Sequence, residues 1–157
     1  WRPLLDGVEP CFILVRRDPA EVAASLNTRD GMALEDAAWL WWRYMSEAER
    51  DTRGAHRIFV DYDQLLSDWR GLIERIGAAF MLPGMSALAL DQNGPGAQEV
   101  DRYLDPAERH HRARTMRDHT GLPEKVASFD AIFRAAVQGN AGEMDKAFAE
   151  LDHDTKA

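Results

Sequence analysis

The sequence has little of what several classes of protein require. It contains one cysteine, Cys11, in 157 residues, so it can form neither an internal disulfide nor a zinc site built on cysteines. Cys11 begins an apolar run, and we expect a buried, inert thiol in a cytoplasmic protein. No apolar stretch approaches the roughly 18 residues that a membrane-spanning helix needs, so no membrane span is expected.

Positive charge is also scarce. Nineteen Lys and Arg residues face 27 Asp and Glu residues, a formal net charge of −8, and so acidic a chain repels nucleic acid unless its basic residues are segregated. Arg16 and Arg17 stand together, and further Arg and His residues lie between 102 and 117. This pattern indicates local anion binding and no nucleic-acid partner. His110 and His111 are adjacent, so they diverge on a helix and predict no metal site.

The N-terminal half has the pattern of buried strands followed by helices. Residues 11–15 form a continuous apolar run, which is typical of a parallel strand buried on both faces. Asp18 and Pro19 then predict a helix start, through an N-cap carboxylate and a proline at the first helical position. This helix is expected to end near residues 30–31.

A second strand–helix unit follows. A helix is predicted from residue 34 to about 53, with Trp39, Trp42 and Met45 on its apolar face. Residues 57–60 predict the second strand, and a third helix then runs to about residue 82. Two strands joined through a long helix indicate a parallel crossover.

We divide the chain into three parts of one domain. Residues 1–82 hold the strand–helix–strand–helix part, and residues 83–99, which carry Gly, Pro, Asn and Gln without periodicity, predict a loop. Residues 100–157 form a helical C-terminal part. Helices are expected there near residues 105–117, 123–137 and 142–151.

The residues with chemical potential follow the strands, where parallel α/β sheets bind their ligands. Arg17 stands at a helix N-terminus, whose free amides and dipole favour an anion, and its guanidinium can bind phosphate through two parallel hydrogen bonds. Ser25, farther along the helix, offers another donor. The alternatives are an ion pair of Arg17 with Asp18 or Glu21 and a packing role for Ser25. Arg16 is expected to be structural or solvent-facing.

These residues carry a family resemblance. Arg17-Asp18-Pro19 followed by Ser25 resembles the 3′-phosphate motif of sulfotransferases that use 3′-phosphoadenosine 5′-phosphosulfate as the sulfate donor. Residues 59–66, with Tyr62, are similar to the family's strand ending in Tyr-Glu-Asp-Leu. Residues 104–112 resemble a C-terminal segment of a bacterial branch of the family.

The resemblance implies an α/β fold with a P-loop NTPase-like parallel sheet and flanking helices, present here in part, and a helix-rich C-terminal part. It implies that Arg17 and Ser25 contact the 3′-phosphate of the donor and that Tyr62 approaches its adenine. Sulfate would pass to a hydroxyl or amine of a small-molecule or glycan acceptor. No metal is implied.

The chain also departs from the family pattern. The Gly/Ser/Thr-rich loop that holds the 5′-phosphosulfate has no match, and the resemblance places the catalytic base before Trp1. We therefore expect the C-terminal portion of a sulfotransferase, without a catalytic residue and inactive by itself. The family's late Arg-Lys-Gly loop is missing as well, and Arg112 or Arg114 is a candidate to replace its phosphate contacts.

Two other interpretations stay open. A P-loop nucleotide-binding enzyme such as a kinase would share the architecture but carry an upstream Gly-x-x-x-x-Gly-Lys-Ser/Thr sequence. A non-catalytic helical interaction module would instead present Trp39, Trp41 and Trp42 on one contiguous exposed patch. The exposure of these three side chains tests that second interpretation.

Overall fold

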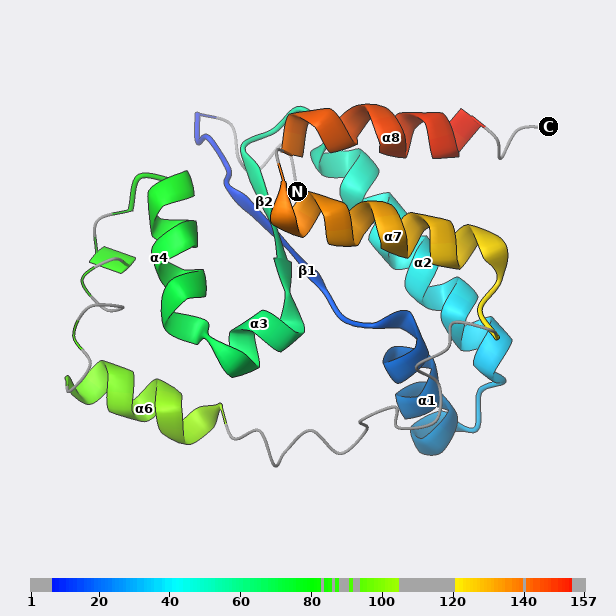
Figure 1. Cartoon of the computed structure of the whole chain (residues 1–157), viewed down its shortest axis with the longest axis horizontal. Coiled ribbons are helices and arrows are strands. Elements are labelled where there is room, and N and C mark those ends of the chain that lie inside the picture. Colours follow the sequence, from blue (N-terminus) through cyan, green and yellow to red (C-terminus); the bar gives the residue numbers. More distant parts are fainter. Residues whose placement is uncertain are drawn as a thin grey trace.

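The computed structural model describes residues 7–82, 84, 85, 87, 91, 94–104, 121–139 and 141–153. It is a mixed α/β fold in which helices surround two parallel strands, β1 (Phe12–Arg16) and β2 (Arg57–Asp61) (Figure 1). Phe12 lies opposite Arg57, and Arg16 lies opposite Asp61. Both predicted strands and their parallel pairing are confirmed.

Helix α1 (Pro19–Asp30) begins as its local sequence predicts. The Asp18 carboxylate accepts hydrogen bonds from the amides of Ala20 (2.9 Å) and Glu21 (3.3 Å). Gly31 ends the helix with φ 69°, a left-handed conformation that glycine adopts without steric cost. The chain then enters α2 (Leu34–Thr52), which packs against α1 and leads to β2.

The inner face of α2 matches the predicted one only in part. Trp42 and Met45 are partly buried and pack against the core, but Trp39 is 36% exposed, and Ala38 and Trp41 are the buried residues. Because residues 39–42 are apolar around most of the helix, periodicity alone could not choose the buried face. With Trp41 buried, the three tryptophans form no contiguous exposed patch, and the interaction-module interpretation loses its required surface.

The C-terminal helices are α7 (Glu124–Gln138) and α8 (Ala141–His153), which confirm two of the three helices expected there. They lie against each other and against β2 (Figure 1). The helix expected at residues 105–117 lies outside the described residues. Within the part of the chain that the structure describes, no helix combines the length and apolar character needed to cross a membrane.

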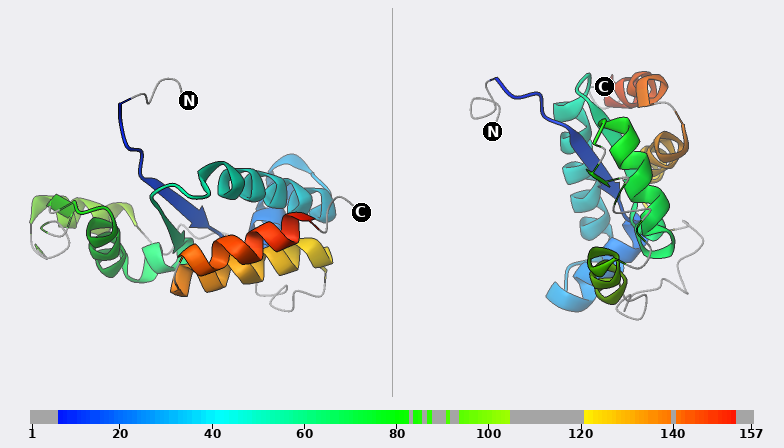
Figure 2. Two further views of the ribbon diagram at one scale, coloured as in Figure 1. Left: turned by 90° about the horizontal axis from the view of Figure 1, so that it is seen from above. Right: turned by 90° about the vertical axis from the view of Figure 1, so that its left-hand side faces the viewer.

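The two faces of the sheet are covered unequally (Figure 2). Leu14 and Phe59 face the main core, which α2, α7 and α8 complete. On the opposite face Val60 packs against α4 (Trp69–Ala79), whereas Ile13 and Val15 are 45% and 47% exposed. The prediction that the first strand is buried on both faces is therefore wrong, because α4 packs over β2.

Cys11 is exposed, which corrects the expectation of a buried thiol. Side chains alternate along a strand, so Cys11 lies on the same open side as Ile13 and Val15. Its Sγ is 3.9 Å from His56 Nδ1. The apolar run at residues 11–15 thus reflects a core on one side only.

The predicted third helix is two helices, α3 (Tyr62–Ser67) and α4. Asp68 interrupts them with φ −152° and ψ 64°, and its carboxylate caps α4 by accepting a hydrogen bond from the Gly71 amide (3.0 Å). Aspartate favours such breaks because its side chain competes for main-chain amides. Helix α3 is short and contains no buried residue of its own.

Helix α6 (Pro95–Tyr103) begins inside the segment 83–99, so the prediction of a loop throughout that segment is wrong. A proline at the first helical position favours this start. Asp101 ties α6 to α4: its Oδ1 accepts hydrogen bonds from Trp69 Nε1 (2.7 Å) and Arg70 Nη1 (3.0 Å), and its Oδ2 accepts one from Arg70 Nη2 (2.7 Å).

The contact between Asp101 and α4 should be lost when acid protonates Asp101. The hydrogen bonds from Arg70, and then that from Trp69, hold the pKa of Asp101 below its ordinary value of 3.8. A lowered pKa means that the contact stabilises the fold above the ordinary value and is lost as the pH falls through the lowered one. In an NMR titration the Trp69 indole N–H resonance should follow this midpoint, and Arg70→Ala should move the midpoint upward. A Trp69 resonance that ignores the titration would contradict the contact.

Candidate functional site

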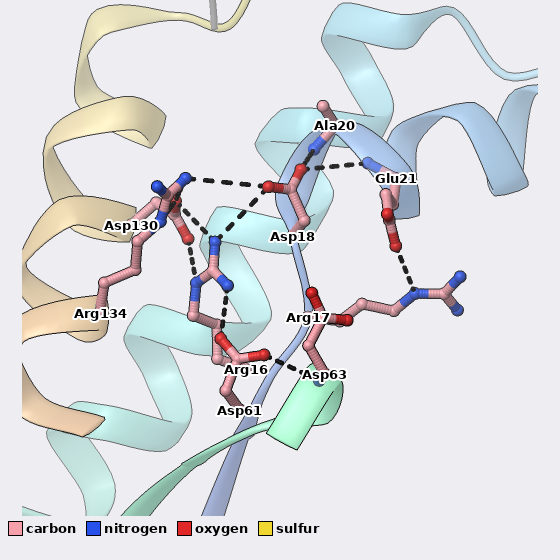
Figure 3. Close-up of polar contacts among 9 residues, drawn as sticks. All are labelled: Arg16, Arg17, Asp18, Ala20, Glu21, Asp61, Asp63, Asp130 and Arg134. Atoms are coloured by element: carbon pink, nitrogen blue, oxygen red, sulfur yellow. Dashed lines mark hydrogen bonds and ion pairs between the residues drawn. The ribbon is translucent and has the colours of Figure 1, made fainter. Parts of the chain in front are cut away.

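Polar residues gather at one edge of the sheet, where both strands end (Figure 3). Arg16 and Asp61, the last residues of β1 and β2, lie opposite each other in the register. Because the strands are parallel, the residues that follow them, Arg17 and Tyr62, emerge at the same edge. The sequence predicted a ligand site at this edge.

Arg17 and Tyr62 meet there. The Arg17 guanidinium carbon lies 5.3 Å from the centre of the Tyr62 ring, within the range of a cation–π contact. Arg17 Nε is also 3.6 Å from Glu21 Oε2, so the ion pair considered as an alternative is formed. The Arg17 side chain is 32% exposed and makes no hydrogen bond with the described residues. Among the described residues, its buried Nε has no hydrogen-bond partner.

Ser25 lies farther along α1. Within α1, Ser25 is one turn beyond Glu21, the residue that pairs with Arg17, so Glu21 and Ser25 share one side of the helix. Ser25 is half-buried and makes no hydrogen bond with any residue that the structure describes. The structure thus brings Arg17 and Tyr62 into contact and leaves Ser25 on α1, one turn beyond the residue that pairs with Arg17.

The first amides of α1 do not contribute as expected. Those of Ala20 and Glu21 both donate to the Asp18 carboxylate. A ligand would have to displace this carboxylate, and its negative charge offsets the positive end of the helix dipole. The expectation that free amides at this helix start hold an anion is wrong for these two groups, and side chains must carry the binding.

Arg16 points away from Arg17, into a buried cluster (Figure 3). It is 4% exposed. Its Nε and Nη2 donate to the two oxygens of Asp130 at 2.6 and 2.9 Å, and its Nη1 donates to Asp61 Oδ2 at 2.7 Å. Of the two roles expected for Arg16, the structural one is confirmed.

The cluster keeps Arg16 charged. Burial by itself would lower the pKa of the Arg16 guanidinium, but the hydrogen bonds and charges of Asp130, and then of Asp61, outweigh burial and raise it above its ordinary value. Arg134 adds a second cation: its Nε donates to Asp130 Oδ2 (2.9 Å). Its Nη2 lies 3.8 Å from Asp18 Oδ2.

Sequence reasoning missed Asp130 and Arg134. Asp130 is 114 positions from Arg16 along the chain, and no local pattern connects them. One signal was present, because Asp130 falls between Phe129 and Phe133 on the apolar side of its helix, and Asp is almost never fully buried without a partner. The Asp130 side chain therefore needed an interior cation.

A cavity of about 580 Å³ opens at the same edge, between α3, α4 and α7. Its lining mixes polar and charged groups: Asp61, Asp63, Gln64, Ser67, Arg75, Arg134, Val137 and Gln138. Arg17, Ser25 and Tyr62 do not line it. Its two carboxylates balance its two guanidinium groups, so its charge favours neither an anion nor a cation.

Several predicted features lie elsewhere. His110, His111, Arg112 and Arg114 are outside the described residues, so their roles stay predictions. Within the described ranges, no group of three or more His, Cys, Asp or Glu residues is placed to hold a metal ion.

Comparisons of the chain with protein-family models, with curated proteins and with solved structures gave no match. The resemblance to sulfotransferases therefore rests on the chain's own motif residues. The class of protein defined by the fold is a mixed α/β domain with a polar site at the carboxyl ends of two parallel strands.

Proposed function

We propose that this chain is part of a sulfotransferase that uses 3′-phosphoadenosine 5′-phosphosulfate, and that it binds the 3′ end of this donor. The observation that carries the proposal is the contact between Arg17 and Tyr62, 5.3 Å apart at the ends of the two parallel strands. In this proposal Arg17 and Ser25 bind the 3′-phosphate and Tyr62 lies beside the adenine. The two motif segments that resemble the family thus meet through this contact.

The proposal extends to the fold. A P-loop NTPase-like sheet has further strands and helices on both faces, and the open face of β1, where Ile13 and Val15 are exposed, is compatible with a further covering element. The parallel pairing and the connection of β1 to β2 through α1 and α2 support it. We place the protein in the cytoplasm as part of this proposal.

Charge sets the strength of binding. The Glu21 carboxylate pairs with Arg17 (Figure 3), so an anionic donor meets attraction and repulsion together. We expect weak binding that salt weakens further. No residue here is assigned to the transfer step, in which charge neutralisation and in-line positioning dominate. The acceptor is a small molecule or glycan with a hydroxyl or amine.

Isothermal titration with adenosine 3′,5′-bisphosphate tests the proposal. Arg17→Ala should weaken binding by about 1.5–3 kcal/mol, roughly 10- to 150-fold in Kd, because charged hydrogen bonds to the phosphate are lost. Adenosine 5′-monophosphate lacks the 3′-phosphate, so it should bind wild type more weakly and be almost indifferent to Arg17→Ala. That difference assigns Arg17 to the 3′-phosphate.

Arg29→Ala is the matched control, because Arg29 lies on α1, the helix that follows Arg17, with an exposed side chain paired to Asp30. It should leave both affinities unchanged. Absence of binding by the intact protein at high micromolar concentration would contradict the proposal. Equal losses for the two nucleotides in Arg17→Ala would contradict the 3′-phosphate assignment, and a kinase-like site would show no preference for the 3′-phosphate.

A further inference from the structure

One buried guanidinium, that of Arg16, joins the start of α1, which follows Arg17, to the start of α3, which begins at Tyr62 (Figure 3). Arg16 Nη1 donates to Asp61 Oδ2 (2.7 Å). The other oxygen of Asp61 accepts the hydrogen bond of the Asp63 amide (2.8 Å) and caps α3. Arg16 Nη2 lies 3.6 Å from Asp18 Oδ2, and Asp18 caps α1.

Helix α3 depends on this connection more than a longer helix would. It has six residues, none of them fully buried, and although Leu65 packs against the core cluster around α4, the cap carries a larger share of its stability than in a longer, buried helix. Tyr62 is its first residue, and the Asp61 cap precedes it directly. The orientation of the Tyr62 ring toward Arg17 therefore depends on where the Asp61 carboxylate is held.

Asp130 holds Arg16 in turn. Its carboxylate, 1% exposed in α7, receives two hydrogen bonds from the guanidinium, at 2.6 and 2.9 Å. Such a two-pronged contact fixes the plane of the guanidinium. Once that plane is fixed, Nη1 is directed at Asp61. Arg134, 44% exposed at the side chain, completes the pairing of Asp130 from the solvent side.

We propose that Arg16 and Asp130 are positioning residues, which set the start of α3 relative to the start of α1 and so hold Tyr62 against Arg17. The effect of this positioning on donor binding rests on the proposed function, whereas its effect on the Arg17–Tyr62 contact does not. Helix α7 thereby becomes part of the site although no side chain of α7 touches Arg17 or Tyr62 among the contacts described.

NMR of the tyrosine rings tests the contact directly. The chain has three tyrosines, and Tyr44 and Tyr103, 65% and 85% exposed, serve as internal references. In wild type, Arg17→Ala should shift the Tyr62 ring signals. In the Asp130→Asn background the Tyr62 signals should move toward those of the reference tyrosines, and adding Arg17→Ala should shift them by less than half as much.

A purely structural role would not produce this signature. Glu49→Gln, in a second buried arginine–carboxylate cluster, is the matched control: it should lower the unfolding temperature and leave Tyr62 in place. If Asp130→Asn does not fold, Arg16→Lys replaces it, because lysine keeps a charge beside Asp130 but cannot bridge to Asp61 with a planar fork. Unchanged Tyr62 signals and an unchanged response to Arg17→Ala in a folded variant would overturn the proposal.

Titration with adenosine 3′,5′-bisphosphate separates the two proposals. If both hold, Asp130→Asn binds about tenfold more weakly than wild type, the equivalent of about 1.4 kcal/mol, and Glu49→Gln binds like wild type. If wild type does not bind while Tyr62 moves in Asp130→Asn, the positioning role stands and the donor proposal fails. If wild type binds and Asp130→Asn binds equally with Tyr62 in place, the positioning role fails and the donor proposal stands.

Discussion

Replacing Glu49 by alanine should lower the free energy of unfolding by about 3–5 kcal/mol, because it removes the buried carboxylate that pairs with a buried positive charge. Glu49 Oε1 accepts hydrogen bonds from Arg57 Nη2 (2.9 Å) and Arg53 Nε (3.0 Å). The side chains of Glu49 and Arg57 are 1% and 2% exposed. After the substitution two guanidinium groups face each other, and Arg57 retains one carboxylate partner, the more exposed Asp145.

Urea unfolding followed by tryptophan fluorescence measures this loss. Glu47→Ala is the matched control, because Glu47 lies on the same helix and pairs with Arg43 at an exposed position. Its effect should stay within about 0.5 kcal/mol. Glu49→Leu combined with Arg57→Met should lose less than Glu49→Ala alone, since no buried charge is then left unpaired. Similar losses for Glu49→Ala and Glu47→Ala would contradict the buried ion pair.

Phe133→Ala should cost a similar amount, about 3–5 kcal/mol, for a different reason: it removes a large side chain from the interior and leaves a cavity. Phe133 is fully buried in α7. Its ring centre lies 5.0 Å from that of Phe59 in an edge-to-face arrangement, and 6.2 and 6.1 Å from those of Phe129 and Phe148. The ring thus joins the sheet to both C-terminal helices.

The same urea experiment checks this loss. Phe133→Leu keeps much of the volume and should lose clearly less than Phe133→Ala. Tyr44→Ala removes an aromatic ring of similar size from a position that is 65% exposed, and its effect should stay within about 0.5 kcal/mol. A loss below about 1 kcal/mol for Phe133→Ala would mean that this ring is not the centre of the core.

Much of the N-terminal half could be predicted, because its signals are local. The cap at Asp18 and the glycine end at Gly31 each involve residues a few positions apart, so the sequence contains all the participants. The break at Asp68 was local too, yet it was missed because the apolar pattern continues across it. The prediction followed the apolar periodicity and gave no weight to the Asp68 side chain. In the fold, the Asp68 carboxylate accepts a hydrogen bond from the Gly71 amide and starts a new helix.

Burial was harder to predict, since it depends on what covers a surface. The tryptophans of α2 offered several apolar faces, and contact with α7 and the sheet buried Trp41. The apolar run of β1 predicted a strand covered on both faces, but α4 packs on β2 and leaves Ile13 and Val15 exposed. Neither the buried face of α2 nor the open face of β1 can be predicted from the residues of that element alone.

The sequence by itself determined the parallel strand–helix order and therefore the edge at which Arg17 and Tyr62 emerge. Only the tertiary structure decided that the two side chains touch, that Glu21 pairs with Arg17, and that Asp130 reaches Arg16. The physical reason is how far apart along the chain the interacting residues lie. Strands, caps and helix ends are set by neighbours along the chain, whereas a buried ion pair forms between residues that only the packing of distant helices brings together.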